Sequence, residues 1–235
     1  MPNVQLKYYK QNPDLEFVLG KHNGSFVYGG FVRDTLRGVP FQDMDVAVPC
    51  LEVAQKFIQN LEGSNRMIHL ETKTIRDSPV YSLEYQCFTM EIQTPMTHRL
   101  KIDITYSNAT SLGGDSLNKC DFTANNLMMD HSGTLSTRIK AYQIGLDISE
   151  AEWLARCIRD CIDGKLVWMI PDRFSKRMGE TEASQTEFMQ KMNMRLQKML
   201  GKGFVETGEH LTSFRLVNVD SMSAEAPVLG DEKPE

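Results

Sequence analysis

The sequence predicts an α+β fold in which a mixed β-sheet carries helices and is followed by a short helical C-terminal module. Up to about residue 145, segments with the period of a strand alternate with segments with the period of a helix. After that point the apolar residues recur at helical spacing. We therefore expect a first domain of residues 1–145 and a helical module of residues 146–222. The Pro-rich, acidic tail of residues 223–235 is expected to be disordered.

The N-terminal domain begins with the signals of a strand, a turn and a helix in close succession. A short apolar run that ends at Tyr28 meets Gly29-Gly30, which is typical of a strand entering a turn. The segment 31–37 then suits a short helix that ends at Gly38.

A second strand is predicted where Met44, Val46 and Val48 alternate with more polar residues. Apolar residues at helical spacing predict a helix over residues 53–61, and dense β-formers between residues 79 and 107 predict two or three further strands. This order of elements fits a mixed sheet with helices on one face.

Two apolar stripes predict helices in the C-terminal module. The first stripe consists of Leu154, Cys157, Ile158, Cys161 and Ile162. The second, which is rich in methionine, consists of Phe188, Met189, Met192, Leu196, Met199 and Leu200. Because methionine fills irregular gaps between helices, we interpret the second stripe as a packing surface and not as a ligand site.

The composition is that of a globular protein, with 41% hydrophobic and 24% charged residues. No stretch approaches the roughly 20 apolar residues of a membrane span, so we expect no membrane partner. The first residues lack the apolar core of a signal peptide, which predicts a cytoplasmic protein. Five cysteines without a C-x-x-C pair are interpreted as reduced, small hydrophobic residues.

The net charge of −5 is unevenly distributed. Residues 165–202 hold eight Lys or Arg against four Asp or Glu, a local charge of +4 that leaves −9 for the remainder. Four of the basic residues recur at i, i+4, i+7 and i+11, which we expect to form a stripe opposite the Met-rich face: Lys191, Arg195, Lys198 and Lys202. This stripe is a candidate site for RNA phosphates, and a solvated helix face explains it equally well.

Three carboxylates carry the chemical argument. Asp43 and Asp45 stand at i and i+2 on a predicted strand, so their side chains share one face with Cα atoms about 7 Å apart. Asp103 lies between apolar residues on another predicted strand, where a lone charge needs a partner or a metal ion. If the strands are neighbours, the three acids converge and suit two Mg²⁺ ions, which stabilise the attacking and leaving oxygens of phosphoryl transfer.

At these residues a family resemblance becomes specific. Residues 28–45, YGGFVRDTLRGVPFQDMD, resemble the head-domain signature of class II CCA-adding enzymes and bacterial poly(A) polymerases, G-G-x-V-R-D-x-L-x-G followed by D-x-D. These enzymes belong to the DNA polymerase β superfamily of nucleotidyltransferases. Residues 102–105, IDIT, are similar to the family's E-V-A-T segment, and residues 118–126, NKCDFTANN, resemble its R-R-D-F-T-I-N-A motif. The resemblance covers residues 24–133.

The resemblance implies a polymerase β-like head and a role for each matching residue. Asp43, Asp45 and Asp103 would be catalytic and would bind two Mg²⁺ or Mn²⁺ ions. A further set would bind the NTP, with the two glycines holding the triphosphate, Arg33 contacting phosphate, Asp34 fixing the loop and Asp121 beside the sugar. This nucleotide-binding set is Gly29, Gly30, Arg33, Asp34, Lys119, Asp121 and Asn125.

The sequence departs from the family pattern at several places. Lys119-Cys120 stands where the family has paired arginines, and Ser107 stands where many members carry an arginine. The nucleotide-selecting motif E-D-x-x-R has its nearest counterpart in residues 171–177, with Arg173 and Arg177 on one helical face. About 90 residues follow the head, too few for the long helical body that grips tRNA.

The function expected from these features is transfer of a nucleoside monophosphate from an NTP, ATP or CTP, to an RNA 3′ end without a template. A partner protein would supply further RNA-binding surface. Two alternatives stay open: transfer to a small molecule or protein, and a nucleotide-binding module without activity. For single residues, simpler explanations also stay open: Asp43 and Asp45 as solvent-facing residues, Arg33 and Asp34 as a surface pair, and Asp121 as a helix cap.

Overall fold

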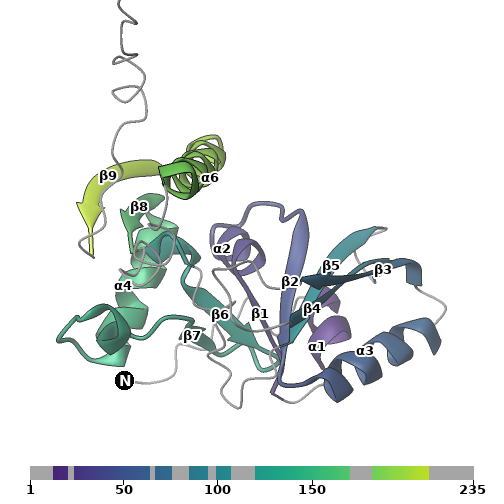
Figure 1. Cartoon of the computed structure of the whole chain (residues 1–235). Helices are drawn as coiled ribbons and strands as arrows, with labels where there is room; N and C mark the ends of the chain where they lie inside the picture. The colour runs from purple at the N-terminus through teal and green to yellow at the C-terminus, as the bar shows by residue number, and fades with distance from the viewer. Residues whose placement is uncertain are drawn as a thin grey trace, which may run out of the picture.

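A computed structural model describes residues 13–20, 24–63, 67–75, 85–94, 99–106, 120–169 and 182–211. Its main feature is a seven-stranded sheet in the order β3-β4-β5-β2-β1-β6-β7 (Figure 1). β2 and β5 run parallel, and every other neighbouring pair is antiparallel. The strands are β1 (Phe26–Tyr28), β2 (Asp43–Val48), β3 (Met67–Ile75), β4 (Tyr85–Ile92), β5 (Leu100–Tyr106), β6 (Leu127–Asp130) and β7 (Leu135–Thr137). The mixed α+β fold predicted from the sequence is confirmed.

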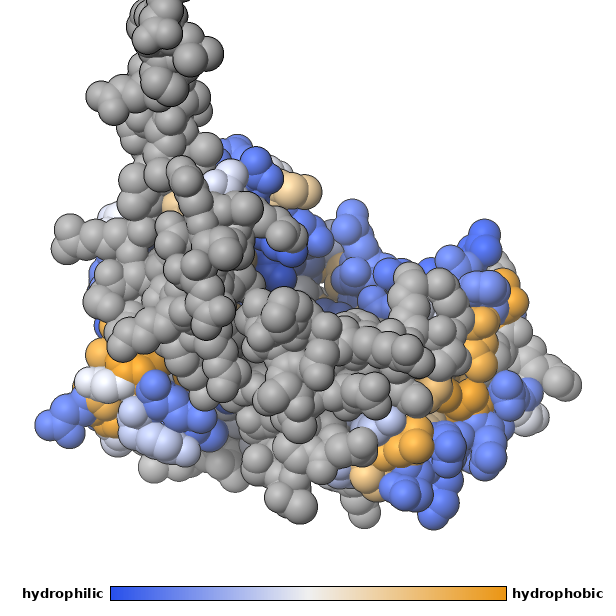
Figure 2. All heavy atoms as spheres, in the orientation of Figure 1, coloured by the Kyte–Doolittle hydropathy of each residue, from blue (hydrophilic) through white to orange (hydrophobic). Residues whose placement is uncertain are grey.

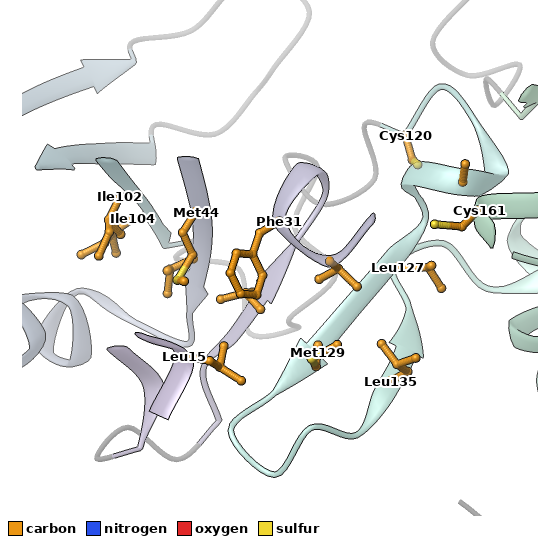
Figure 3. Close-up of a cluster of buried hydrophobic side chains, with 14 of the residues drawn as sticks. Leu15, Phe31, Met44, Ile102, Ile104, Cys120, Leu127, Met129, Leu135 and Cys161 are labelled. Atoms are coloured by element: carbon orange, nitrogen blue, oxygen red, sulfur yellow. The ribbon is translucent and has the colours of Figure 1, made fainter. Parts of the chain in front are cut away.

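The central strands divide the sheet into an apolar and a polar face. Met44 and Val46 of β2 are in register with Ile102 and Ile104 of β5, and all four side chains are fully buried. Figure 3 shows Met44, Ile102 and Ile104 side by side within the cluster of buried side chains. Because side chains alternate along a strand, the intervening residues of β2 and β5 project from the opposite face.

Three N-terminal helices contribute to this core. They are α1 (Pro13–Leu19), α2 (Gly30–Leu36) and α3 (Leu51–Gly63). α1 and α3 lie on the same side of the sheet (Figure 1), and Leu15 of α1 and Phe57 of α3 are buried in one cluster with Met44. The helix predicted over residues 31–37 is α2, and the helix predicted over residues 53–61 is α3. α1 and β3 were not predicted.

The described residues of the C-terminal part form two α-helices and a second, two-stranded sheet. α4 (Glu150–Ile162) begins at a capping box in which Ser149 Oγ accepts from Glu152 N, and α6 (Glu182–Leu200) carries the Met-rich stripe. β8 (Lys165–Trp168) and β9 (Val205–His210) pair in parallel, so the module is not purely helical. The short 3-10 helix η2 (Thr123–Asn125) precedes β6, and the 3-10 helix η3 (Ala141–Ile144) lies between β7 and α4.

Both predicted stripes pack into the core, with exceptions at their ends. Cys157 and Cys161 of α4 are fully buried, whereas Ile162 is 54% exposed. Met192 and Met199 of α6 are buried, and so are Phe188 and Leu196. The Met-rich stripe is thus a packing surface, as expected. The domain boundary near residue 145 stays a prediction, and the tail of residues 223–235 lies outside the described residues.

The cysteines whose side chains are described, Cys50, Cys120, Cys157 and Cys161, are free thiols. Burial raises the pKa of the Cys120 and Cys161 thiols to about 12, so both are protonated at neutral pH. Among the described residues, no helix combines the length and apolar character that crossing a membrane requires.

Candidate active site

The turn between β1 and α2 brings the backbone close to a carboxylate. Gly29 has a φ of 66°, which L side chains rarely adopt, and its N–H donates to Leu127 O at 3.3 Å. A Cβ atom at Gly29 would lie 3.3 Å from Asp45 Oδ2, and one at Gly30 would lie 3.8 Å from Asp43 Oδ1. Glycine at position 29 therefore keeps the turn free of a tight contact with β2, whereas a Cβ at Gly30 would make ordinary contacts.

The polar face of the sheet gathers the three predicted carboxylates. Asp45 is in register with Asp103 on β5 and with Tyr28 on β1, and Asp43 lies one pleat away on the same face of β2. β2 and β5 are neighbours, as the sequence hypothesis requires. All three acids are partly buried.

Asp103 has protein partners on both of its oxygens. Thr89 Oγ1 donates to Asp103 Oδ1 at 2.6 Å, and Lys101 Nζ lies 3.3 Å from Asp103 Oδ2. Within the described ranges, no three His, Cys, Asp or Glu side chains are arranged to hold one metal ion together. Asp103 therefore faces the same side as the D-x-D pair but is engaged by a lysine.

The electrostatics of this face nevertheless suit a divalent cation. The pKa of Asp45 is raised from 3.8 to about 6: burial is the largest cause, the charges of Asp43 and Asp103 act in the same direction, and Arg138 and Lys101 act against them. Because this carboxyl is held partly protonated beside two other acids, a bound cation would stabilise its ionised form. Carboxylate oxygens are also the ligands that Mg²⁺ and Mn²⁺ prefer. The donor set of Asp43 and Asp45 thus fits such an ion.

A cavity of about 440 Å³ opens between the polar face and α6. In Figure 2 the upper part of the visible face, where α6 approaches the sheet, is mostly hydrophilic. Ten residues singled out from the sequence line the cavity: Gly29, Gly30, Arg33, Asp43, Asp45, Asp121, Asn125, Arg195, Lys198 and Lys202. Asp34, Asp103 and Lys191 are not among its lining residues. Lys119, Arg173 and Arg177 lie outside the described residues.

Arg33 and Asp34 form a buried network and not a surface pair. Arg33 is 5% exposed and Asp34 is 2% exposed. Arg33 Nε donates to Asp34 Oδ1 at 2.7 Å, and Arg33 Nη1 donates to Asn125 Oδ1 at 2.8 Å. Asp34 Oδ2 also accepts from Lys202 Nζ at 2.6 Å. These contacts tie α2 to η2 and to the turn after α6. The loop-fixing role expected of Asp34 stays a prediction.

Asp121 contacts α6 and caps no helix. Its Oδ2 accepts from Arg195 Nη1 at 2.6 Å, whereas the N-cap of η2 is Phe122, without a side-chain hydrogen bond. Asp121 lines the cavity, and its partner Arg195 stands 74 positions further along the chain.

The basic stripe was expected opposite the Met-rich face, and the two are separated only in part: Lys191, Arg195 and Lys198 are exposed and Met192 is buried, but Met199 lines the cavity beside the basic residues. Arg195, Lys198, Met199 and Lys202 line the same cavity. Arg195, Lys198 and Met199 stand at i, i+3 and i+4 and share one face of α6, whereas Lys202 follows in the turn after the helix. The cavity wall therefore mixes three cations with a methionine.

Tyr28, Thr105, Cys120 and Arg138 also line the cavity but were not predicted as site residues. The Arg138 guanidinium lies 4.6 Å from the centre of the Tyr28 ring, a cation–π contact. Nothing in the sequence around Arg138 forms a motif; only the antiparallel return of β6 and β7 brings it beside Tyr28.

The sequence of this site matches a known family model. The Poly A polymerase head domain matches residues 25–145, slightly more than half of the chain. The chain belongs to this family of nucleotidyltransferase head domains. The match confirms the resemblance to class II CCA-adding enzymes and bacterial poly(A) polymerases drawn from the motifs. No curated protein matches the sequence.

Several solved structures are similar over part of the chain. A CCA-adding enzyme with CTP is 19% identical with a TM-score of 0.38, covering 61% of this chain and 29% of its own. A tRNA-processing enzyme (apo form I) is 18% identical with a TM-score of 0.37, covering 61% and 31%. The Thermotoga maritima CCA-adding enzyme complexed with tRNA is 22% identical with a TM-score of 0.34, covering 60% and 27%. The chain spans less than a third of the length of each.

Proposed function

We propose that the chain is a metal-dependent, template-independent nucleotidyltransferase that adds a nucleoside monophosphate from an NTP to an RNA 3′ end. One observation carries this proposal: Asp43 and Asp45 project from one strand face beside the Gly29-Gly30 turn, at a cavity of about 440 Å³. That volume is in the range of small-molecule sites, about 300–1,000 Å³.

Asp43, Asp45 and Asp103 would hold two Mg²⁺ or Mn²⁺ ions. When bound, such ions lower the pKa of the acceptor hydroxyl and neutralise charge on the transferred phosphoryl group. The protein's part is to hold the three carboxylates on one face and to keep the turn at Gly29 open. Lys101 would compete with a metal ion for Asp103, because its ammonium lies 3.3 Å from Asp103 Oδ2.

The nucleotide would lie in the cavity with its triphosphate along the Gly29-Gly30 backbone and its sugar near Asp121 and Asn125. All four residues line the cavity, which supports this orientation. Arg33 would act by fixing Asn125, to which it donates, since its own side chain is buried. From the sequence resemblance alone, Lys119, Arg173 and Arg177 complete the proposed nucleotide-binding set.

The RNA acceptor would approach over α6. Of the four basic residues proposed to bind it, Lys191 is not among the cavity-lining residues, whereas Arg195, Lys198 and Lys202 line the cavity. Lys191 would therefore bind the RNA acceptor outside the cavity, and the other three basic residues would contact the ligand that occupies the cavity. ATP or CTP is the proposed NTP, a partner protein would extend the RNA-binding surface, and the cytoplasm is the proposed location.

The test incubates the protein with each labelled NTP, Mg²⁺ or Mn²⁺, and an RNA that ends in a 3′-hydroxyl. The matched control is the same RNA with a 3′-phosphate, which has no attacking group. We expect the first RNA to grow by one or more nucleotides and the second to stay unchanged. If the labelled nucleotide is instead transferred to a protein or a small molecule and neither RNA is extended, the acceptor is not RNA and this part of the proposal is wrong.

The contact between Lys101 and Asp103 favours a second candidate, a nucleotide-binding module without catalysis, because a lysine takes the place of a cation at the third carboxylate. In the same assay this candidate predicts NTP binding without transfer to any acceptor, with Mg²⁺ and with Mn²⁺ alike.

A further inference from the structure

The end of α6 is held to the head domain on both sides of one exposed lysine. On one side, Arg195 Nη1 donates to Asp121 Oδ2 at 2.6 Å. On the other side, Lys202 Nζ donates to Asp34 Oδ2 at 2.6 Å, and Lys202 O accepts from Arg37 Nη1 at 3.1 Å. These contacts fix the position of the segment 195–202, which comprises the end of α6 and the turn after it, relative to the head domain.

Lys198 lies within this segment and lines the same cavity as Gly29, Gly30, Asp43 and Asp45. It stands three residues after Arg195, so the two share one face of α6, and Lys202 follows in the turn after the helix. The side chain is exposed, and within the part of the chain that the structure describes its ammonium group makes no hydrogen bond or ion pair.

The charges around the cavity leave a role for such a lysine. Lys202 and Arg33 both contact the buried Asp34, and Arg195 contacts Asp121. These three cations are therefore wholly or partly neutralised by protein carboxylates. A nucleoside triphosphate carries several negative charges, and phosphate oxygens bind most strongly to charged donors.

We propose that Lys198 is a triphosphate-binding residue, so that α6 supplies from the C-terminal module a cation for the substrate phosphates. The inference rests on the proposed function and deepens it. It also assigns Lys198 to the NTP and not to the RNA, which leaves Lys191 as its counterpart on the acceptor side. The loss of a cation at Cys120 and at Ser107, relative to the family pattern, makes a cation from α6 more important to phosphate binding in this chain.

The experiment compares Lys198→Ala with Lys191→Ala, since both remove one exposed lysine of the same helix. Binding of MgATP and MgCTP, of AMP and CMP, and of a short single-stranded RNA is measured by titration calorimetry on the full chain. We expect Lys198→Ala to weaken NTP binding at least about tenfold, as loss of a charged hydrogen bond does. Binding of the nucleoside monophosphates should change less than about twofold, because they lack the β- and γ-phosphates. Lys191→Ala should leave NTP binding unchanged, and Lys198→Arg should restore most of it.

Three results would overturn the inference, and they differ in what they leave standing. If wild type binds NTP and Lys198→Ala binds it equally well, Lys198 does not bind the triphosphate and the proposed function is unaffected. If Lys198→Ala weakens RNA binding alone, the lysine belongs to the acceptor. If wild type binds no NTP with Mg²⁺ or Mn²⁺, the proposed function and the inference both fail. Circular dichroism of both variants establishes that α6 is retained.

Discussion

Replacing Asp45 by Asn should stabilise the metal-free protein, even though it removes a proposed metal ligand. The pKa of this carboxyl is raised from 3.8 to about 6, first by burial and then by Asp43 and Asp103. A shift of about two pKa units corresponds to about 3 kcal/mol, and partial screening of the neighbouring charges reduces this to about 2–3 kcal/mol. Asparagine has the same shape without the charge, so it removes this cost.

The pH dependence follows from the direction of the shift. Because the folded state binds the Asp45 proton more tightly than the unfolded state, stability falls as pH rises from about 4 to about 6 and the full cost is present above that. At pH 5 about half of the cost remains. For a chain of this size, about 2–3 kcal/mol corresponds to an increase in Tm of about 5–10 °C at pH 7.5.

The assay is thermal unfolding of wild type and Asp45→Asn in EDTA at pH 5 and pH 7.5, followed by addition of Mg²⁺. We expect the variant's advantage to be larger at pH 7.5, and we expect Mg²⁺ to raise the Tm of wild type more than that of the variant. The reasoning is refuted if the variant has the same Tm as wild type at pH 7.5, or if its advantage is the same at both pH values.

Three further predictions concern single residues of the site. Asp121→Ala should narrow the preference for NTP over dNTP by about 1–3 kcal/mol, because a charged hydrogen bond to the 2′-hydroxyl is lost. If the ratio of NTP to dNTP incorporation in a single-nucleotide assay is unchanged, Asp121 does not bind the sugar. Gly29→Ala should destabilise the fold by about 1–2 kcal/mol because of its positive φ. Gly30→Ala, where the added Cβ meets ordinary contacts, is the matched control in thermal unfolding, and equal losses contradict the argument. Asp103→Ala should lower transfer at least about a hundredfold and raise the Mg²⁺ concentration needed for half-maximal rate; a full rate in this variant places the third ligand elsewhere.

The carboxylate face was predictable because its information is local. Alternation of Asp43, Met44 and Asp45 fixes which side chains share a face, and the apolar residues around Asp103 fix the same for β5. Whether the two strands are neighbours stayed a condition of the hypothesis. The structure places the two strands in parallel register, with Asp45 beside Asp103.

The contribution of α6 to the cavity was not predictable from periodicity. An apolar stripe shows that a helix is packed, but it does not show which cleft its polar residues border. Here the contacts are long-range: Arg195 reaches Asp121 and Lys202 reaches Asp34 across separations of 74 and 168 positions. The parallel pairing of β8 with β9 was missed for the same reason, since the helix α6 lies between them in the chain.

The contact of Lys101 with the third carboxylate was also not predicted from the sequence. Lys101 and Asp103 stand at i and i+2 on β5, so the same alternation that brings the acids together places this cation among them. A lysine at that position predicts that its ammonium competes with a metal ion for Asp103, and the family motif does not indicate this competition.

The central claim is that Asp43 and Asp45 on one face of β2 hold the metal ions of a nucleotidyl transfer. The most direct measurement is the rate of labelled nucleotide incorporation into RNA by Asp43→Asn, compared with wild type at saturating NTP and Mg²⁺. We predict a loss of at least about two to three orders of magnitude, as removal of a metal ligand causes, in a protein whose Tm in EDTA is no lower than that of wild type. Wild-type incorporation by the Asp43→Asn protein would contradict the account.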